Sequence, residues 1–115
     1  MKWFLGAICF FGIPFIMQAN AFEKDFEEYT KTCSKKNTDV CYNAALVYEE
    51  RGDFKQALHY HTKACNYKEP IACAALGRYY SEGTGVAQDE KKASEYYNRA
   101  CKLGKEQFNS DEWCF

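Results

Sequence analysis

Apolar and small residues recur along this chain at the three- and four-residue spacing of an amphipathic helix. One such segment begins at Cys41, and a second follows Gly52, where Asp53 can cap a new helix. Two further segments show the same spacing, one from Cys73 and one from Ala93. The predicted inner positions of the four segments are Cys41, Ala44, Ala45 and Tyr48; Ala57, Tyr60, His61 and Ala64; Cys73, Leu76, Gly77 and Tyr80; and Ala93, Tyr96, Tyr97 and Ala100. The pattern predicts four helices in two pairs.

The second pair repeats the first. A shift of 36 positions aligns residues 53–65 with 89–101, and a shift of 32 aligns residues 41–48 with 73–80. The difference falls in one place, where the second copy has EGTGVAQD and the first has RGD. Because helices do not tolerate internal insertions, a loop is expected there. Repetition with this period is typical of a helical solenoid.

Partial copies flank the two full ones. Phe26 aligns with Leu58, so the start of the folded region matches only a second helix, and the end carries Trp113 and Cys114 on what we expect to be a short remnant helix. We predict an all-α fold, a short α/α solenoid of helix pairs held together by disulfides. Its folded region, 22–115, is predicted to comprise a half-repeat 22–36, repeats 37–68 and 69–104, and a remnant helix 105–115.

The first 21 residues have the features of a secretory signal peptide. Lys2 is followed by the apolar run Trp3–Met17, and Ala19-Asn20-Ala21 places small residues where a signal peptidase cleaves. The competing interpretation is a membrane anchor, because an apolar run of about 20 residues can span a bilayer. Pro14 and the terminal small residues favour cleavage after Ala21, an exported periplasmic or secreted protein, and no stable membrane anchor afterwards.

Charge and core composition narrow the class further. The chain has a formal net charge of −1, and loss of Lys2 would make it about −2, so the charge balance gives no reason to expect a nucleic-acid partner. The apolar residues beyond residue 21 are mostly Ala and Tyr, not Leu, Ile and Val. So small a core is expected to need covalent support.

Cysteines can supply that support. In TCSKKNTDVC and ACNYKEPIAC the two cysteines lie eight positions apart, about 12 Å along an uninterrupted helix, whereas a disulfide needs Cα atoms within about 7 Å. Turn residues within each segment, such as Asn37 and Pro70, allow the chain to reverse. No C-x2-4-C pair is present, which disfavours a zinc site and a thiol oxidoreductase. The predicted disulfides are Cys33–Cys41, Cys65–Cys73 and Cys101–Cys114, the last with the longer spacing.

Several motifs resemble a known repeat family. The segment ACAALGRYY (72–80), then Gly83-Thr84-Gly85-Val86, Asp89, Lys92-Ala93 and YYNRA (96–100), is similar to the Sel-like type of tetratricopeptide repeat. The cysteine pairs between units resemble those of the Helicobacter cysteine-rich protein family. This resemblance implies an exported protein. It also implies either weak β-lactamase activity with penicillin binding or engagement of host or envelope partners.

Residues able to hydrolyse a β-lactam are hard to find. None of the four serines beyond residue 21 has Lys three positions later, as a serine β-lactamase requires; these serines are Ser34, Ser81, Ser94 and Ser110. On a helix, His59 and His61 point about 200° apart and cannot share a metal ion. The turn Gly83–Gly85 lacks the following Lys-Ser/Thr of a phosphate loop. We therefore assign no catalytic residue, metal or cofactor, and β-lactam hydrolysis stays an alternative implied by resemblance alone.

A groove is the stronger candidate for function. In stacked helix pairs the first helices line a concave surface, and Tyr, Leu and Arg there would give apolar anchors with a polar orienter. We expect a binding scaffold for a protein, peptide or peptidoglycan fragment, with a β-lactam as a further candidate ligand; a groove without a specific ligand is the open alternative. The predicted lining residues are Asp39, Tyr42, Asn43, Leu46, Glu49, Ile71, Ala74, Arg78 and Ser81.

Overall fold

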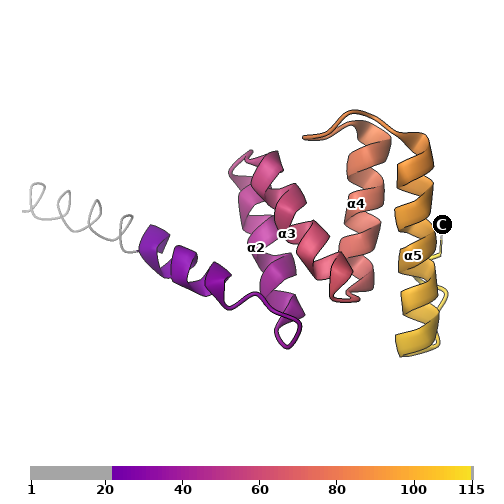
Figure 1. The fold of residues 1–115 in the computed structure, drawn as a ribbon, viewed down its shortest axis with the longest axis horizontal. Helices are drawn as coiled ribbons and strands as arrows, with labels where there is room; N and C mark the ends of the chain where they lie inside the picture. The colour runs from indigo at the N-terminus through magenta and orange to yellow at the C-terminus, as the bar shows by residue number, and fades with distance from the viewer. Residues whose placement is uncertain (1–21, 115) are drawn as a thin grey trace, which may run out of the picture. The chain divides into compact units, whose positions relative to one another are not determined.

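A computed structural model describes residues 22–114, which divide into two units. The first unit, described from residue 22 to Thr32, is helical over residues 22–31. The second unit begins at Cys33 and contains four helices, drawn in Figure 1: α2 (Thr38–Glu50), α3 (Phe54–Asn66), α4 (Pro70–Glu82) and α5 (Glu90–Phe108). The described residues contain no strand, only an isolated bridge between Ser34 and Asn37. The predicted all-α class is confirmed.

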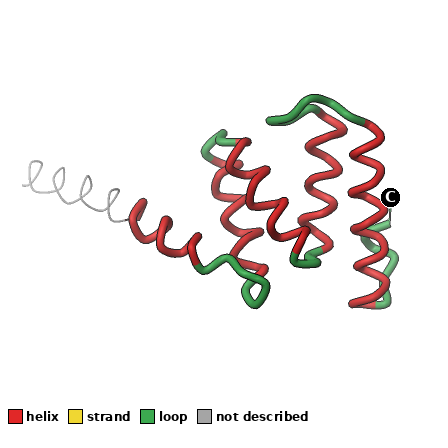
Figure 2. Tube along the Cα trace, viewed as in Figure 1, coloured by secondary structure: helices red, strands yellow, loops and turns green. Residues whose placement is uncertain are grey.

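The four helices of the second unit form a stack of neighbours. α2 packs against α3, α3 against α4 and α4 against α5. Figure 2 shows that each helix runs opposite to the one before it, with a loop at every reversal. This order is that of an α/α solenoid. No helix within residues 22–114 is both long enough and apolar enough to cross a bilayer. The predicted signal peptide lies outside the described residues.

Four of the helix boundaries have a local cause in the sequence. The carboxylate of Asp53 accepts a hydrogen bond from the backbone N–H of Gln56 at 3.2 Å and so starts α3. Asp89 does the same for α5, with the N–H of Lys92 at 3.0 Å. Pro70 occupies the first turn of α4, and Gly83 ends that helix with φ +70°.

Three disulfides stabilise the second unit. They are the pairs predicted from the sequence, Cys33–Cys41, Cys65–Cys73 and Cys101–Cys114, with Cα atoms 4.8, 4.7 and 4.3 Å apart. The second pair joins the end of α3 to the start of α4, at the junction of the two repeats. Around it lies a core of small residues, with Leu76 and Tyr79 among its few large members. The spacing of the cysteines therefore indicates where the chain reverses direction between or after helices.

The C-terminal segment differs from its prediction. Residues 105–115 were expected to form a separate remnant helix; instead α5 continues to Phe108 and ends at Asn109, which has φ +50°. Residues 110–114 then form a turn without helix, and the indole of Trp113 packs on Gly104, where a Cβ would overlap it. The Cys101–Cys114 disulfide explains the difference, because it requires the chain to fold back along α5.

Candidate functional site

A groove of about 350 Å³ lies between α2 and α4 in the second unit. α2 contributes an aromatic ring, an apolar chain and a carboxylate; α4 contributes small and apolar residues with one guanidinium; and α5 adds one ring. The lining residues are Tyr42, Leu46 and Glu49; Ile71, Ala74, Ala75 and Arg78; and Tyr97. We call this the α2/α4 groove. Its volume lies at the lower end of the range of small-molecule and side-chain pockets, about 300–1,000 Å³.

Six of the nine groove residues predicted from the sequence line this cavity. The other three do not. Asp39 and Asn43 are exposed outside it, and the hydroxyl of Ser81 donates to Glu90 of α5 at 3.3 Å. Sequence reasoning missed Ala75 and Tyr97. The alignment of Tyr97 with His61 was a usable signal for a side chain pointing inward, but only the packing shows that the ring reaches the groove.

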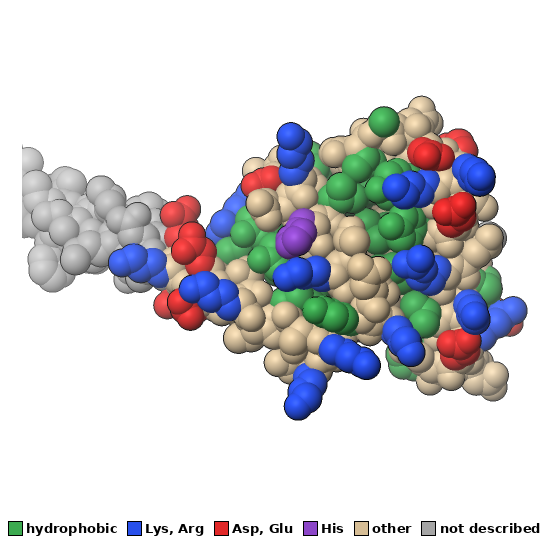
Figure 3. Space-filling view, viewed as in Figure 1, with side chains coloured by type: hydrophobic (Ala, Val, Ile, Leu, Met, Phe, Trp, Pro, Cys, Tyr) green, Lys and Arg blue, Asp and Glu red, His purple; other side chains and the backbone are tan. Residues whose placement is uncertain are grey.

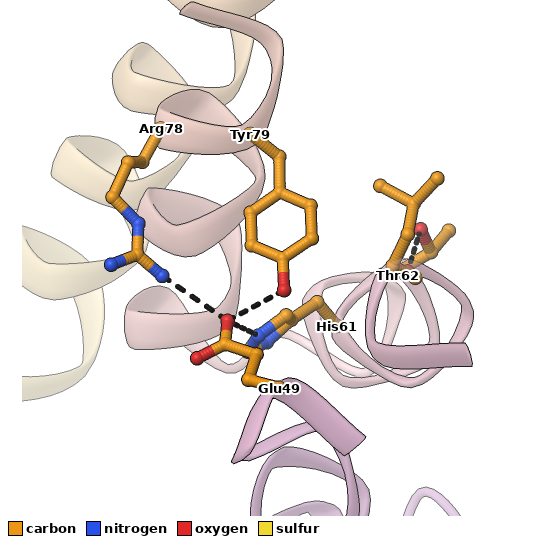
Figure 4. A network of polar contacts seen from close by, with 6 residues as sticks. Glu49, His61, Thr62, Arg78 and Tyr79 are labelled. Carbon is orange, nitrogen blue, oxygen red and sulfur yellow. Dashed lines mark hydrogen bonds and ion pairs between the residues drawn. The ribbon is translucent and has the colours of Figure 1, made fainter. Parts of the chain in front are cut away.

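A polar network fixes the end of the groove where the two repeats meet (Figure 4). One carboxylate oxygen of Glu49, Oε1, accepts three hydrogen bonds. The donors are the Tyr79 hydroxyl at 2.6 Å, His61 Nε2 at 3.0 Å and Arg78 Nη2 at 3.1 Å. Glu49 belongs to α2, His61 to α3, and the other two donors to α4. The network therefore joins three helices and orients the guanidinium of Arg78 in the groove.

Charges and burial within the network set its proton affinities. Burial opposes ionisation of Glu49, but the hydrogen bonds from Tyr79 and His61 outweigh it and hold the pKa of this carboxyl below its ordinary value. Burial lowers the pKa of His61, and the neighbouring Arg78 lowers it further, against the opposing effect of Glu49. Burial and the Glu49 hydrogen bond raise the pKa of Tyr79. The network thus consists of a carboxylate, a neutral imidazole, a neutral phenol and the guanidinium of Arg78.

His61 itself is buried completely, as expected from its place on the inner face of α3. Its ring lies 5.6 Å from the ring of Tyr42 and 5.4 Å from that of Tyr79. Nε2 donates to Glu49, and buried Nδ1 has no hydrogen-bond partner within residues 22–114. A proton on Nδ1 would be a buried donor without an acceptor, which explains the lowered pKa. The sequence did not predict the hydrogen bond between His61 and Glu49.

A second cavity, of about 420 Å³, adjoins the α2/α4 groove and shares Glu49 and Arg78 with it. Two more glutamates and two rings complete most of its lining. The residues are Glu49, Glu50, Phe54, Arg78, Tyr79, Glu82 and Thr84. We call it the acidic pocket.

Positive charge gathers elsewhere. Figure 3 shows Lys and Arg side chains spread over the visible face of the molecule, with Asp and Glu side chains among them. A third cavity, of about 360 Å³, has three cations in its lining. Its residues are Cys65, Asn66, Lys68, Arg99, Lys102, Leu103 and Glu106.

The described residues show no cluster of three His, Cys, Asp or Glu side chains suited to a metal ion. His59 is exposed while His61 is buried, so the two imidazoles face different surroundings. The cavities are lined by groups that bind through packing, hydrogen bonds and charge. Chemically, the groove and its network offer apolar surface, hydrogen-bonding groups and one guanidinium.

A family model describes the helix pairs. The Sel1 repeat matches residues 39–66 and again residues 70–105, which together make up more than half of the chain. The chain belongs to the Sel1 repeat family. The two matches correspond to α2 with α3 and to α4 with α5. The resemblance to Sel-like repeats noted from the sequence is therefore confirmed.

Curated proteins from animals and bacteria are similar to parts of this chain. Cytochrome c oxidase assembly factor 7A of Xenopus laevis is 34% identical over 84 residues, 69% of this chain and 36% of its own length. Beta-lactamase HcpA of Helicobacter pylori is 45% identical over 47 residues, 41% of this chain and 19% of its own. Putative beta-lactamase HcpD of the same species is 35% identical over 43 residues, 37% of this chain and 14% of its own. The Helicobacter cysteine-rich proteins are thus among its relatives, and the chain spans about a third of the first assembly factor.

Proposed function

We propose that this Sel1 repeat protein is a binding scaffold that holds a short segment of a partner protein in the α2/α4 groove. The observation that carries the proposal is the network on Glu49, which orients Arg78 beside apolar lining residues such as Leu46 and Ile71. A guanidinium held by a partly buried carboxylate is preorganised, so less conformational entropy is lost when a ligand binds.

Several features of the groove support a peptide-like ligand. The lining combines two tyrosine rings and aliphatic side chains with one cation, the kind of composition found at the centre of protein interfaces. Tyr42 and Leu46 lie one helical turn apart on α2, and their side chains can contact successive positions of an extended segment. Helix-pair repeats also place such a groove on rigid elements, which suits binding without rearrangement.

The proposal can be tested with a display library of random dodecapeptides panned against the purified protein with its disulfides formed. We expect peptides to be enriched, and we expect Tyr42→Ala to weaken their binding by about tenfold or more, because a central aromatic contact is worth roughly 1–2 kcal/mol or more. Isothermal titration of the enriched peptides gives the affinities.

The matched control is Phe108→Ala. This ring is 61% exposed at the end of α5 and lies outside the groove, so its removal takes away an exposed aromatic residue without changing the site. Peptides that bind the wild type and Phe108→Ala but not Tyr42→Ala support the proposal. Enrichment that survives Tyr42→Ala together with Arg78→Ala contradicts it, as does the absence of any enriched peptide.

We also propose that the protein is exported. Support comes from the charged and apolar pattern of residues 1–21 and from three disulfides, which persist in oxidising compartments. N-terminal sequencing of the protein recovered from its producing cells would test this. A mature chain beginning at Phe22 is the expected result, and a chain that keeps its apolar N-terminus contradicts it.

β-Lactam hydrolysis is a second candidate, favoured by one observation: the 45% identity to Beta-lactamase HcpA. The assay is the rate of nitrocefin hydrolysis by the oxidised protein. If the α2/α4 groove holds the β-lactam, Arg78→Ala should reduce the rate, since this guanidinium is the cation placed to bind the drug's carboxylate. A rate equal to buffer alone rejects the candidate.

A further inference from the structure

We propose that the acidic pocket receives a Lys or Arg side chain of the same partner segment whose apolar side chain fills the α2/α4 groove. The ligand class is thus a peptide with an apolar residue and a basic residue at a constant spacing. This inference rests on the proposed function and adds to it the charge of the partner.

The α2/α4 groove and the acidic pocket are adjacent cavities. Glu49 and Arg78 line both of them, so these two side chains form the boundary between the apolar groove and the acidic pocket. Figure 4 shows Arg78 and Tyr79 reaching from α4 toward Glu49, where their hydrogen bonds converge. Because the network holds this boundary in place, a segment that lies across it meets both cavities at a fixed distance.

Charge selects the occupant of the second cavity. Its lining contains three glutamates and one arginine. Arg78 is already paired with Glu49 at 3.1 Å, which leaves Glu50 and Glu82 to set the potential. Both are exposed, and neither has an ion-pair partner within residues 22–114. Two unpaired carboxylates at the rim of a cavity attract a cation and repel an acidic side chain.

The shape of the pocket suits a long basic side chain. Phe54 is 40% exposed, and its ring centroid lies 6.4 Å from that of Tyr79, in an edge-on arrangement. Lys and Arg bury their aliphatic stems on such rings while the charged group stays near solvent, and the ring faces attract the cation. The carboxylates of Glu50 and Glu82 would then accept its hydrogen bonds.

The loop that distinguishes the two repeats helps to build this pocket. Gly85, with φ +68°, packs so closely on Phe54 that a Cβ there would lie 3.1 Å from the Phe54 Cβ. Thr84 of the same loop lines the pocket. The longer loop after α4 thus reaches back to the start of α3 and forms one wall. A three-residue loop, such as residues 51–53 of the first repeat, would be too short to make this contact.

The experiment uses the dodecapeptide library described above, panned against the purified oxidised wild type and two charge-reversed variants. Glu50→Lys/Glu82→Lys reverses the pocket. Glu95→Lys/Glu112→Lys changes the net charge by the same amount at exposed positions outside all three cavities. We expect wild type and control to enrich peptides with Lys or Arg at a constant spacing from an apolar residue. We expect the pocket variant to enrich Asp or Glu at that position.

A second measurement does not depend on the variants folding. An enriched peptide is titrated into the wild type beside its Lys→Gln or Arg→Gln analogue. Loss of one cation facing two exposed carboxylates should weaken binding roughly three- to tenfold, and only the parent peptide should lose affinity as salt is raised. Equal affinities, or enriched peptides without a basic residue, overturn the inference and leave the groove proposal standing. If no peptide is enriched, the groove proposal fails as well.

Discussion

The two helix pairs, α2 with α3 and α4 with α5, solve the same packing problem with different side chains. What they share lies on the inner faces between the paired helices. Tyr48 stacks on Tyr60 with centroids 5.6 Å apart and planes at 14°, and Tyr80 stacks on Tyr96 with centroids 5.6 Å apart and planes at 9°. These four residues occupy matching positions of the repeat. The stacked tyrosines are thus a feature of both helix pairs.

The pairs differ where they meet. The first pair has Ala45 and, one turn further along α2, Glu49, with His61 on α3. The second pair has Gly77 at the position equivalent to Ala45 and Tyr97 at the position equivalent to His61. The Tyr97 ring lies so close to Gly77 that a Cβ there would be 2.7 Å from it. The larger ring of Tyr97 in the second pair is therefore accompanied by a smaller residue, Gly77, beside it. The first pair, α2 with α3, instead has the polar network on Glu49, which extends to α4.

The largest effect should come from the disulfide between the pairs. Replacing Cys65 and Cys73 by Ala should lower the free energy of unfolding by about 2–5 kcal/mol. Both residues are at most 2% exposed, so the loss also disturbs the central core. Cys101→Ala/Cys114→Ala, at the partly exposed end of α5, should cost less. Urea unfolding followed by circular dichroism measures both. A terminal pair that costs more than the central pair would reverse this ranking.

The next largest effect concerns Glu49, which has Ser81 as its counterpart in the second pair. Glu49→Ala leaves the Tyr79 hydroxyl and His61 Nε2 without their acceptor, and burying unsatisfied donors costs about 1–3 kcal/mol. Ser81→Ala removes only a partly exposed hydrogen bond to Glu90 and should cost less than about 1 kcal/mol. The comparison uses chemical denaturation at pH 7. Equal losses would show that the network adds nothing to the first pair.

Gly77 should not accept an alanine without cost, although its counterpart in the first pair, Ala45, is one. An alanine in place of glycine inside a helix usually stabilises by about 1 kcal/mol, but at Gly77 the new methyl must displace the Tyr97 ring, and overpacking costs about 1–3 kcal/mol. Gly77→Ala should therefore be destabilising or neutral. Adding Tyr97→Leu should restore the usual gain, which a double-mutant cycle of unfolding free energies detects. An undiminished gain in the single variant would refute the close packing.

A pH dependence should distinguish the first pair. Because the pKa of His61 is below its ordinary value, the unfolded chain binds more protons just below about pH 6.5. Stability therefore rises with pH there and is lost as pH falls, by at most about 1.4 kcal/mol per pH unit for one group. The lowered pKa of Glu49 acts in the same direction at lower pH.

Urea titrations between pH 5 and pH 7.5 would show this slope. His61→Gln should abolish it above pH 5, because the amide still donates to Glu49 but does not titrate. His59→Gln is the control, since His59 is exposed on the same helix. A slope that persists in His61→Gln, or vanishes in His59→Gln, would place the titrating group elsewhere.

The sequence alone was sufficient for the four helices of the two repeats and for the three disulfides. Residues repeating at helical spacing, Asp53 and Asp89 at matching caps, and cysteines eight apart are local signals, because each reflects one turn of backbone or one reversal of the chain. The tertiary structure decided the site. Glu49 and Arg78 were recognisable as groove residues, but their bond, 29 positions apart, depends on how α2 and α4 approach. The Tyr97 ring lies in the groove because Gly77 has no side chain to exclude it. The chain at Trp113 folds back because the Cys101–Cys114 disulfide holds it against α5. Such contacts between distant residues depend on the volumes of both partners, which no single segment of sequence specifies.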